Sequence, residues 1–347
     1  MYTVSFIYVW GLVMVSLCYT FYVAKLVGRG TMRQILIFPV FLIFFIVPLL
    51  VSSIHLVCIT AFFIAWLANF KIILFAFGRG PLYSNLSLPV FVAVSSLPIK
   101  IQLSPKPSTL QGSREGLLNY AKKFALLVIV TKIIEYSSKL PDKAVLTLYV
   151  MLHSYFTLEV ILSTVSVVVR ATTNLELEPQ FNKPHMATSL QNFWGRRWNL
   201  MVTGILRPTV YEPMIQLLSS GGLSRNPSQY LAVFITFAVS GLMHVLIFFY
   251  IGRLRPDWKV MWFFLINGFC TSVEIAIKKN VKGRFPTAIS RVLTIGFVMV
   301  TSWWLFFPEF KRCNLFERVF QEYVSIGAFA AGIKNIITTS LFSAYRS

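Results

Sequence analysis

Acidic residues are scarce in this chain of 347 residues, which has 12 Asp and Glu against 32 Lys and Arg and a formal net charge of +20. Charged residues together make up 13% of the chain, about half the share found in soluble proteins, whereas hydrophobic residues make up 56%. So few charged side chains cannot cover a water-soluble surface. The composition therefore excludes soluble and disordered proteins and predicts a polytopic membrane protein.

Cysteine and histidine are also few, and neither is clustered. The four cysteines are far apart and form no C-x-x-C pair, so they predict neither a disulfide framework nor a zinc site. No two of the four histidines lie within five residues of each other, which excludes the ligand cluster of a membrane di-iron desaturase. The phosphate-binding loop G-x-x-x-x-G-K-[ST], the nucleophile elbow G-x-S-x-G and the acyltransferase pattern H-x-x-x-D are absent. We expect no metal, no cofactor and no covalent acyl-enzyme.

The excess of basic residues is spread over short runs between apolar stretches. This pattern is typical of a membrane protein that meets anionic lipid headgroups, and not of a protein that binds nucleic acid. Most of these charges are expected to set the orientation of the chain in the membrane. A few of them could also hold an anionic substrate such as a phosphorylated carrier.

Apolar runs long enough to cross a bilayer follow one another along the chain. A spanning helix needs about 20 mainly apolar residues. The sequence predicts an all-α polytopic membrane protein with about eight to ten spans, forming a single membrane-embedded domain over residues 1–347. The expected spans are residues 4–26, 35–51, 54–77, 117–134, 144–169, 230–251, 260–277, 288–307 and 323–341. Residues 86–97 are too few to span and are expected to be re-entrant.

Residues 171–213 are the most polar part of the chain and are expected to form a loop and an interfacial helix. They contain the run F-W-G-R-R-W-N, in which Arg196 and Arg197 could bind phosphates bidentately. Trp194 and Trp198 are four residues apart and would share one face of a helix. The alternative is an interfacial helix with a tryptophan belt and headgroup-binding arginines. That alternative does not account for Asn199, a carboxamide beside the arginine pair.

His244 is an ionisable side chain in the middle of the predicted span 230–251. Such residues are costly in lipid and usually face an interior cavity. A neutral imidazole in that position could take a proton from an alcohol as a general base. The alternative is a structural hydrogen bond between helices.

These motifs resemble the plant wax-synthase branch of the membrane-bound O-acyltransferase family. The resemblance rests on F-W-G-R-R-W-N (193–199), followed about forty residues later by S-G-L-M-H (240–244) in an apolar helix. It extends to W-L-A-N-F-K (66–71) and L-E-P-Q-F-N-K-P (177–184), so it covers nearly the whole chain. The branch includes long-chain-alcohol O-fatty-acyltransferases and sterol O-acyltransferases, and the match leans towards the latter.

The resemblance implies a helical bundle around a tunnel in the endoplasmic reticulum membrane. Acyl-CoA would enter from the cytosol as a co-substrate, and a lipid alcohol would enter from the bilayer. His244 and Asn199 correspond to the family's histidine and asparagine and would be the catalytic pair. Arg196, Arg197, Trp194 and Trp198 would bind acyl-CoA.

The chain departs from the family pattern at two positions. Related sequences commonly carry Asp where this chain has Asn192, and Glu where it has Val245. The second departure removes a carboxylate beside the proposed base.

Two other function classes fit parts of the sequence. A transporter would also use His244, Asn267 and Glu274 as polar groups within the membrane. It should show a repeated half with broken helices, and no such repeat is visible. A non-catalytic lipid-binding protein would not need His244 or Asn199.

Overall fold

The computed structural model describes residues 2–82, 86–101, 121–122, 124–130, 132, 143–173, 177–281 and 285–325. These residues are mainly helical, and the one β pairing among them is an isolated bridge between Ile101 and Leu177. The predicted all-α class is therefore confirmed. In chain order the elements are α1 (Tyr2–Leu26), α2 (Thr31–Ile46), η1 (Val47–Leu50), α3 (Ile54–Ile59), η2 (Thr60–Ala68), α4 (Asn69–Ala76), α5 (Leu88–Ser96), α7 (Lys143–Thr173), η4 (Pro184–Met186), α8 (Leu190–Arg196), α9 (Leu200–Leu206), η5 (Arg207–Tyr211), α10 (Glu212–Ser220), α11 (Arg225–Gly252), α12 (Lys259–Asn280), α13 (Thr287–Thr301), η6 (Ser302–Phe306) and α14 (Phe307–Arg312).

Six helices in the described part of the chain are long and apolar enough to cross a membrane. They are Phe6–Leu26, Thr31–Leu50, Ile54–Ala76, Arg225–Gly252, Lys259–Asn280 and Thr287–Arg312. They coincide with six predicted spans and confirm a multi-pass membrane protein. The predicted span 144–169 lies within the single helix α7. Eight of the 18 residues of 117–134 and all but three residues of 323–341 lie outside the described residues, so the total of eight to ten spans stays a prediction.

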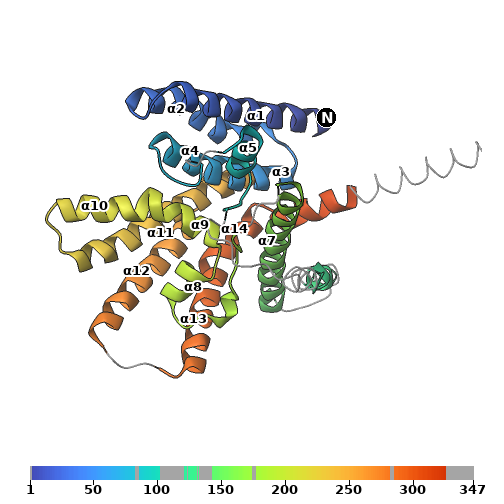
Figure 1. Cartoon of the computed structure of the whole chain (residues 1–347). Coiled ribbons are helices and arrows are strands. Elements are labelled where there is room, and N and C mark those ends of the chain that lie inside the picture. The colour runs from blue at the N-terminus through green and yellow to red at the C-terminus, as the bar shows by residue number, and fades with distance from the viewer. Residues whose placement is uncertain are drawn as a thin grey trace, which may run out of the picture.

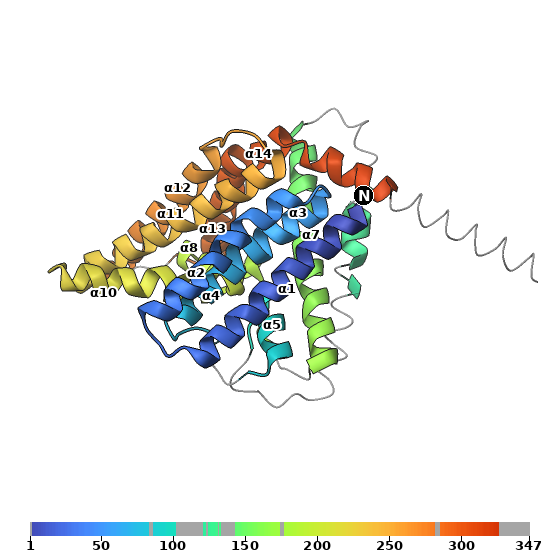
Figure 2. The ribbon, with the colours of Figure 1, turned by 90° about the horizontal axis from the view of Figure 1, so that it is seen from above.

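The third span, which runs through α3, η2 and α4, is the centre of the bundle. In it 72% of the residues of the apolar window are buried, against at most 44% in the other five spans. Helices α1 and α2 lie along one side of it, at the top of Figure 1, and α11 and α12 lie on the other side. Figure 2 shows the same helices from above, with α7 crossing beyond α1.

Two buried cations hold the ends of helices in this central region. The amino group of Lys71 donates to the carbonyl oxygens of Val94 and Leu97, both at 2.6 Å, where α5 ends. Arg33 donates to the carbonyl of Phe75 at 2.8 Å, at the end of α4. The last carbonyls of a helix have no partner within it, so a cation there satisfies them. Helix α5 has nine residues, and it is too short to span, as predicted for 86–97.

Three segments, η2, η5 and η6, are π-helical. Widened turns of this kind are rare in proteins and occur frequently at functional sites. In η5 the second residue is Pro208, whose missing N–H removes one hydrogen bond of an ordinary helix. All three segments lie close to α11 or α12.

Helices α11 and α12 form an antiparallel pair (Figures 1 and 2), and one glycine of each helix lies at their contact. A Cβ atom on Gly241 would lie 2.8 Å from the sulfur of Met261 and 2.9 Å from Cβ of Phe264. A Cβ on Gly268 would lie 2.7 Å from Cβ of Phe237. Small residues allow helix backbones to approach in a membrane, where packing replaces the hydrophobic effect as the driving force.

The polar stretch 171–213, predicted as a loop and an interfacial helix, contains more than one helix. It contains the short helices α8 and α9, separated by a turn at residues 197–199, followed by η5 and the start of α10. Asn199 has a φ of 38°, in the left-handed region, which asparagine tolerates better than most residues. The prediction that Trp194 and Trp198 share one helix face is therefore wrong, because α8 ends at Arg196.

Candidate active site

An extended segment, residues 177–183, fixes the turn that carries Asn199, and we call this segment the strap. The backbone N–H of Asn182 donates to the carbonyl of Arg197 at 2.9 Å, and that of Leu200 donates to the carbonyl of Gln180 at 2.8 Å. The side chain of Gln180 is buried, and its Nε2 donates to the carbonyl of Pro98 at 2.7 Å. The strap thus connects the turn to the segment that follows α5.

Asn199 is buried at the N-terminus of α9. Its Oδ1 accepts a long hydrogen bond of 3.4 Å from the backbone N–H of Val202. No described residue accepts a hydrogen bond from its amide nitrogen. The carboxamide is therefore held by its oxygen and keeps its N–H groups for another acceptor.

Arg197 connects the strap to α8. Its Nε donates to Oδ1 of Asn192 at 2.7 Å, and Nη1 donates to the carbonyls of Asn182 and Lys183 at 3.0 and 3.2 Å. Asn192 is one of the two positions where the chain departs from the family pattern, and its carboxamide oxygen accepts from this guanidinium. Arg197 therefore has a structural role within the turn.

Arg196 is exposed at the last residue of α8 and forms no hydrogen bond or ion pair with any described residue. The acid that could have paired with it, Glu178, bonds the amino group of Lys100 at 2.8 Å. A second acid close to the motif in the sequence, Glu176, lies outside the described residues. Of the two adjacent arginines, Arg196 is the one free to bind an anion.

The two tryptophans of the motif pack against neighbouring aromatic rings, and their binding of acyl-CoA stays a prediction. The indole Nε1 of Trp194 donates to Oδ1 of Asn267 at 3.2 Å, and its ring lies 5.8 Å from that of Phe237. Trp194 therefore anchors α8 to both α11 and α12. The ring of Trp198 is stacked on Phe193 at 5.5 Å. Although they do not share a helix face, the two indoles meet edge to face at 6.4 Å.

His244 lies on α11 with its Nδ1 2.8 Å from the carbonyl oxygen of Ser240. A carbonyl only accepts hydrogen bonds, so the neutral ring carries its proton on Nδ1 and leaves the lone pair on Nε2. No described residue bonds Nε2. With this tautomer, Nε2 can act as a general base. The carbonyl of Ser240 fixes the tautomer, so His244 needs no carboxylate partner for this purpose.

Aromatic rings surround His244 on three sides. The ring centroids of Phe264, Trp66 and Phe306 lie 4.4, 5.0 and 5.7 Å from that of the imidazole. Trp66 belongs to η2 and Phe306 to η6, so two π segments contribute to this surround. Val245, at the other departure from the family pattern, is buried in the main core, which also contains Phe264.

Trp66 connects the histidine to the asparagine helix. It is the centre of a buried cluster with Leu206 of α9 and Met243 of α11, and Val202 packs against the same cluster. Val202 is also the residue whose N–H bonds Asn199. The structure thus places the two predicted catalytic residues on elements that meet over Trp66, and no hydrogen bond joins them directly.

Two polar residues that a transporter could have used are engaged in holding α8. Asn267 bonds Trp194, and its Nδ2 donates to the carbonyl of Phe263 at 2.9 Å. Glu274 accepts from the backbone N–H of Leu190 at 2.7 Å, at the start of α8. Both residues thus have structural partners at the motif.

Three residues of this region were not identified from the sequence as contributing to the site: Trp66, Gln180 and the capping acid Glu274. Trp66 and Gln180 lie in the two stretches, 66–71 and 177–184, that support the family resemblance. Membership of these stretches was the only sequence feature that could have pointed to them. Nothing in the sequence indicated which partners they would meet.

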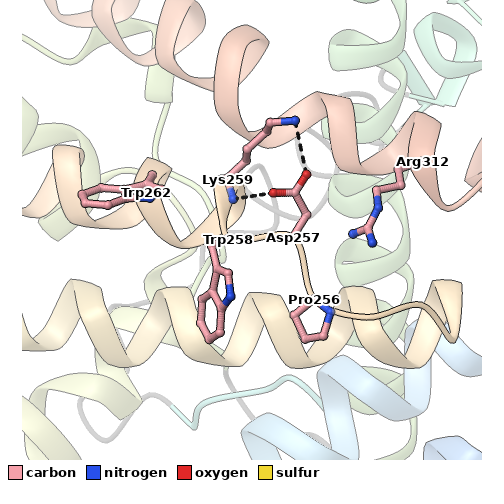
Figure 3. Close-up of a pocket in the computed structure, with 6 residues that line it drawn as sticks. All are labelled: Pro256, Asp257, Trp258, Lys259, Trp262 and Arg312. Carbon is pink, nitrogen blue, oxygen red and sulfur yellow. Dashed lines mark hydrogen bonds and ion pairs between the residues drawn. The ribbon is translucent and has the colours of Figure 1, made fainter.

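A pocket of about 400 Å³ lies away from these residues, at the turn between α11 and α12 (Figure 3). It is lined by Pro256, Asp257, Trp258, Lys259, Trp262 and Arg312. The carboxylate of Asp257 points towards Lys259 and lies 3.3 Å from its amino group. Burial opposes ionisation of Asp257, but the hydrogen bonds and the charge of Lys259 outweigh it and lower its pKa.

This pocket is at the opposite end of α12 from the motif. Glu274, which holds α8, is 15 residues beyond Lys259, about 22 Å along the helix at 1.5 Å per residue. None of the predicted site residues lines it. The tunnel implied by the family resemblance stays a prediction. Among the described residues, no three His, Cys, Asp or Glu side chains form a group that could hold a metal ion.

Comparison of the chain with known proteins gives the same family as the sequence motifs. Residues 177–266 match the model of the membrane bound O-acyl transferase family. The chain is 66% identical to acyl-CoA–sterol O-acyltransferase 1 of Arabidopsis thaliana, over 97% of this chain and 99% of that protein. It is 41% identical to the long-chain-alcohol O-fatty-acyltransferase of Simmondsia chinensis, over 92% of this chain and 93% of the other. The resemblance recognised in the sequence is confirmed.

Proposed function

The chain belongs to the membrane bound O-acyl transferase family, and we propose that it esterifies a lipid alcohol with a fatty acyl group taken from acyl-CoA. The observation that carries the proposal is the state of His244. Its Nδ1 is held by a backbone carbonyl, its Nε2 has no partner among the described residues, and aromatic rings flank the imidazole on three sides. A general base for an alcohol needs this arrangement.

The reaction follows from the chemistry of the two substrates. The alcohol oxygen attacks the thioester carbonyl while its proton moves to Nε2 of His244. The C–O bond forms, the C–S bond breaks, and the imidazolium returns the proton to the departing sulfur. The products are a neutral ester and the free thiol of CoA. Neither an acyl-enzyme nor a cofactor takes part in this sequence, in which acyl-CoA is a co-substrate.

Asn199 and Arg196 are the other residues in this proposal. The free amide N–H groups of Asn199 suit a carbonyl oxygen that gains negative charge in the transition state. The exposed guanidinium of Arg196 suits a CoA phosphate. Arg197, Trp194 and Trp198 support the site by holding the turn and α8 in place.

The acceptor we propose first is a sterol. Support comes from the 66% identity to a protein named a sterol acyltransferase, compared with 41% to one named a long-chain-alcohol acyltransferase. A long-chain fatty alcohol is the second candidate. We further propose that the enzyme resides in the endoplasmic reticulum membrane, taking acyl-CoA from the cytosol and the alcohol from the bilayer.

Expression in a yeast strain that lacks its own sterol and glycerol acyltransferases tests the function. We expect sterol esters to appear with the wild-type chain and to be lost with His244→Gln at equal protein level. Removal of a general base costs roughly 10²–10⁴-fold in rate, and glutamine can bond but cannot take the proton. A fully active Gln variant would overturn the catalytic assignment. Wax esters in place of sterol esters, when fatty alcohol is supplied, would select the second acceptor.

A further inference from the structure

The indole N–H of Trp66 is a buried donor without a partner. Trp66 is 1% exposed, and no described residue accepts a hydrogen bond from its Nε1. Leaving such a group unpaired is costly, most of all within a membrane span, where water is not available. A buried unpaired donor in a native protein therefore requires an explanation.

The position of this donor suggests what it binds. The ring of Trp66 stands edge to face with that of His244, at 5.0 Å and 75°. His244 in turn has a free acceptor, Nε2, because Nδ1 is bonded to Ser240. The site thus has one unpaired donor and one unpaired acceptor on adjacent rings. A hydroxyl group, which donates once and accepts, complements that pair, whereas a carbonyl would use only the donor.

We infer that Trp66 is a substrate-binding residue for the acceptor alcohol. Its Nε1–H donates to the hydroxyl oxygen, and the same hydroxyl donates to Nε2 of His244. The inference rests on the proposed function, because it requires His244 to act on an alcohol. Trp66 lies between α9 and α11, so it also sets the hydroxyl between the histidine and the helix that begins after Asn199.

The π-helical form of η2 fits this role. Trp66 is the seventh of the nine residues of this segment, in the most deeply buried span of the bundle. The widened turn changes the direction in which the following side chains leave the helix.

Trp66→Phe tests the inference, because it keeps an aromatic ring and removes the N–H. The matched control is Trp10→Phe, since the indole N–H of Trp10 is also buried and unpaired but lies on α1, away from His244. We expect Trp66→Phe to raise the KM for the alcohol roughly 3- to 10-fold, the value of one neutral hydrogen bond. The KM for acyl-CoA should not change, and the control should change neither.

Equal rises in both KM values, or no change in either, would overturn the inference and leave Trp66 a packing residue. Because KM does not depend on the amount of enzyme, reduced accumulation of the variant does not obscure the result. If Trp66→Phe does not accumulate at all, 3-benzothienylalanine at position 66 provides the same test, since it keeps the bicyclic shape and replaces N–H by sulfur. His244→Gln is measured in the same membranes. If His244→Gln is inactive and Trp66→Phe has a normal KM for the alcohol, only the role of Trp66 is refuted. If His244→Gln is fully active, the proposed function itself is refuted.

Discussion

Arg196 and Arg197 are adjacent in the sequence but differ in what surrounds them. Arg197 donates to a side chain and two backbone carbonyls and so belongs to the turn, whereas Arg196 is exposed at the end of α8. The sequence could not separate the two, because a dipeptide of identical residues carries no information on which side chain the backbone turns inwards. Their substitutions should therefore have different effects.

We expect Arg196→Ala to raise the KM for acyl-CoA by roughly tenfold or more, because a hydrogen bond to a charged group is lost. The KM for the alcohol should not change. Arg197→Ala should instead lower the thermal unfolding temperature, since three hydrogen bonds of the turn are lost. Steady-state kinetics and unfolding of the purified variants check both. A stable Arg197→Ala protein with weakened acyl-CoA binding would reverse the assignment.

Asn199 combines a backbone role and a chemical role that a pair of variants can separate. Its φ of 38° is a conformation that glycine adopts without cost and that alanine adopts at about 1–2 kcal/mol. We expect Asn199→Gly to keep the stability of the protein but to lower turnover by ~10²-fold, because the carboxamide donor is lost. Asn199→Ala should lose both turnover and stability. Full turnover of the glycine variant at normal protein level would exclude Asn199 from the chemistry.

At the scale of elements, the approach of α11 to α12 sets the surroundings of His244. Gly241 is one turn before His244 and touches Phe264, whose ring is 4.4 Å from the imidazole. The close contact could not be read from the sequence, because a glycine in an apolar helix has no side chain to indicate which neighbour it meets. By contrast, the spans themselves were predictable, since each is a run of about 20 apolar residues.

Gly241→Ala should therefore disturb both packing and activity. Its Cβ would lie 2.8 Å from the sulfur of Met261 and 2.9 Å from Cβ of Phe264, so one of these must move. We expect a loss of about 1–3 kcal/mol in unfolding free energy, typical of overpacking, together with reduced turnover. Gly296→Ala is the control, because nothing lies within 4 Å of the added atom, and it should not destabilise the protein. Equal stability of the two variants would contradict the close packing of α11 and α12.

The turn around Asn199 is a second element-scale feature that the sequence only partly predicts. The run F-W-G-R-R-W-N indicated a functional segment, but we expected one helix where two short helices meet at a left-handed residue. The reason is non-local. The strap bonds the turn on both sides of Asn199 and holds a conformation that helical periodicity cannot reveal.

At the scale of the whole molecule, the excess of basic residues has a structural use beyond orientation in the membrane. Lys71, Arg33 and Arg197 bond backbone carbonyls, and so do Arg253, with Pro48, and Arg318, with Ile251. Carbonyls at helix ends accept from cations, so few carboxylates are needed as partners. The composition indicated where such charges could lie along the chain, but not which of them are buried.

One carboxylate does connect distant parts of the chain. Glu322 lies in the helical residues 315–325 and accepts from the backbone N–H of Ile54 and of His55 at the start of α3. It also accepts from the hydroxyl of Ser53 at 3.1 Å and lies 2.5 Å from Nδ1 of His55. The carboxylate thus caps the central span, at a helix N-terminus where a negative charge is favoured.

This cap should make stability depend on pH in the acidic range. Burial alone would raise the pKa of Glu322, but the hydrogen bonds from His55, Ile54 and Ser53 outweigh it and hold that pKa below its ordinary value of 4.5. The folded protein therefore binds the proton less readily than the unfolded chain, so the cap stabilises fully above pH 4.5 and is lost as the pH falls through the lowered pKa. We expect the unfolding temperature of detergent-solubilised wild type to fall more steeply below pH 4.5 than that of Glu322→Gln, which should be less stable at pH 7. Parallel curves for the two proteins would mean that Glu322 does not hold the central span to the helical residues 315–325.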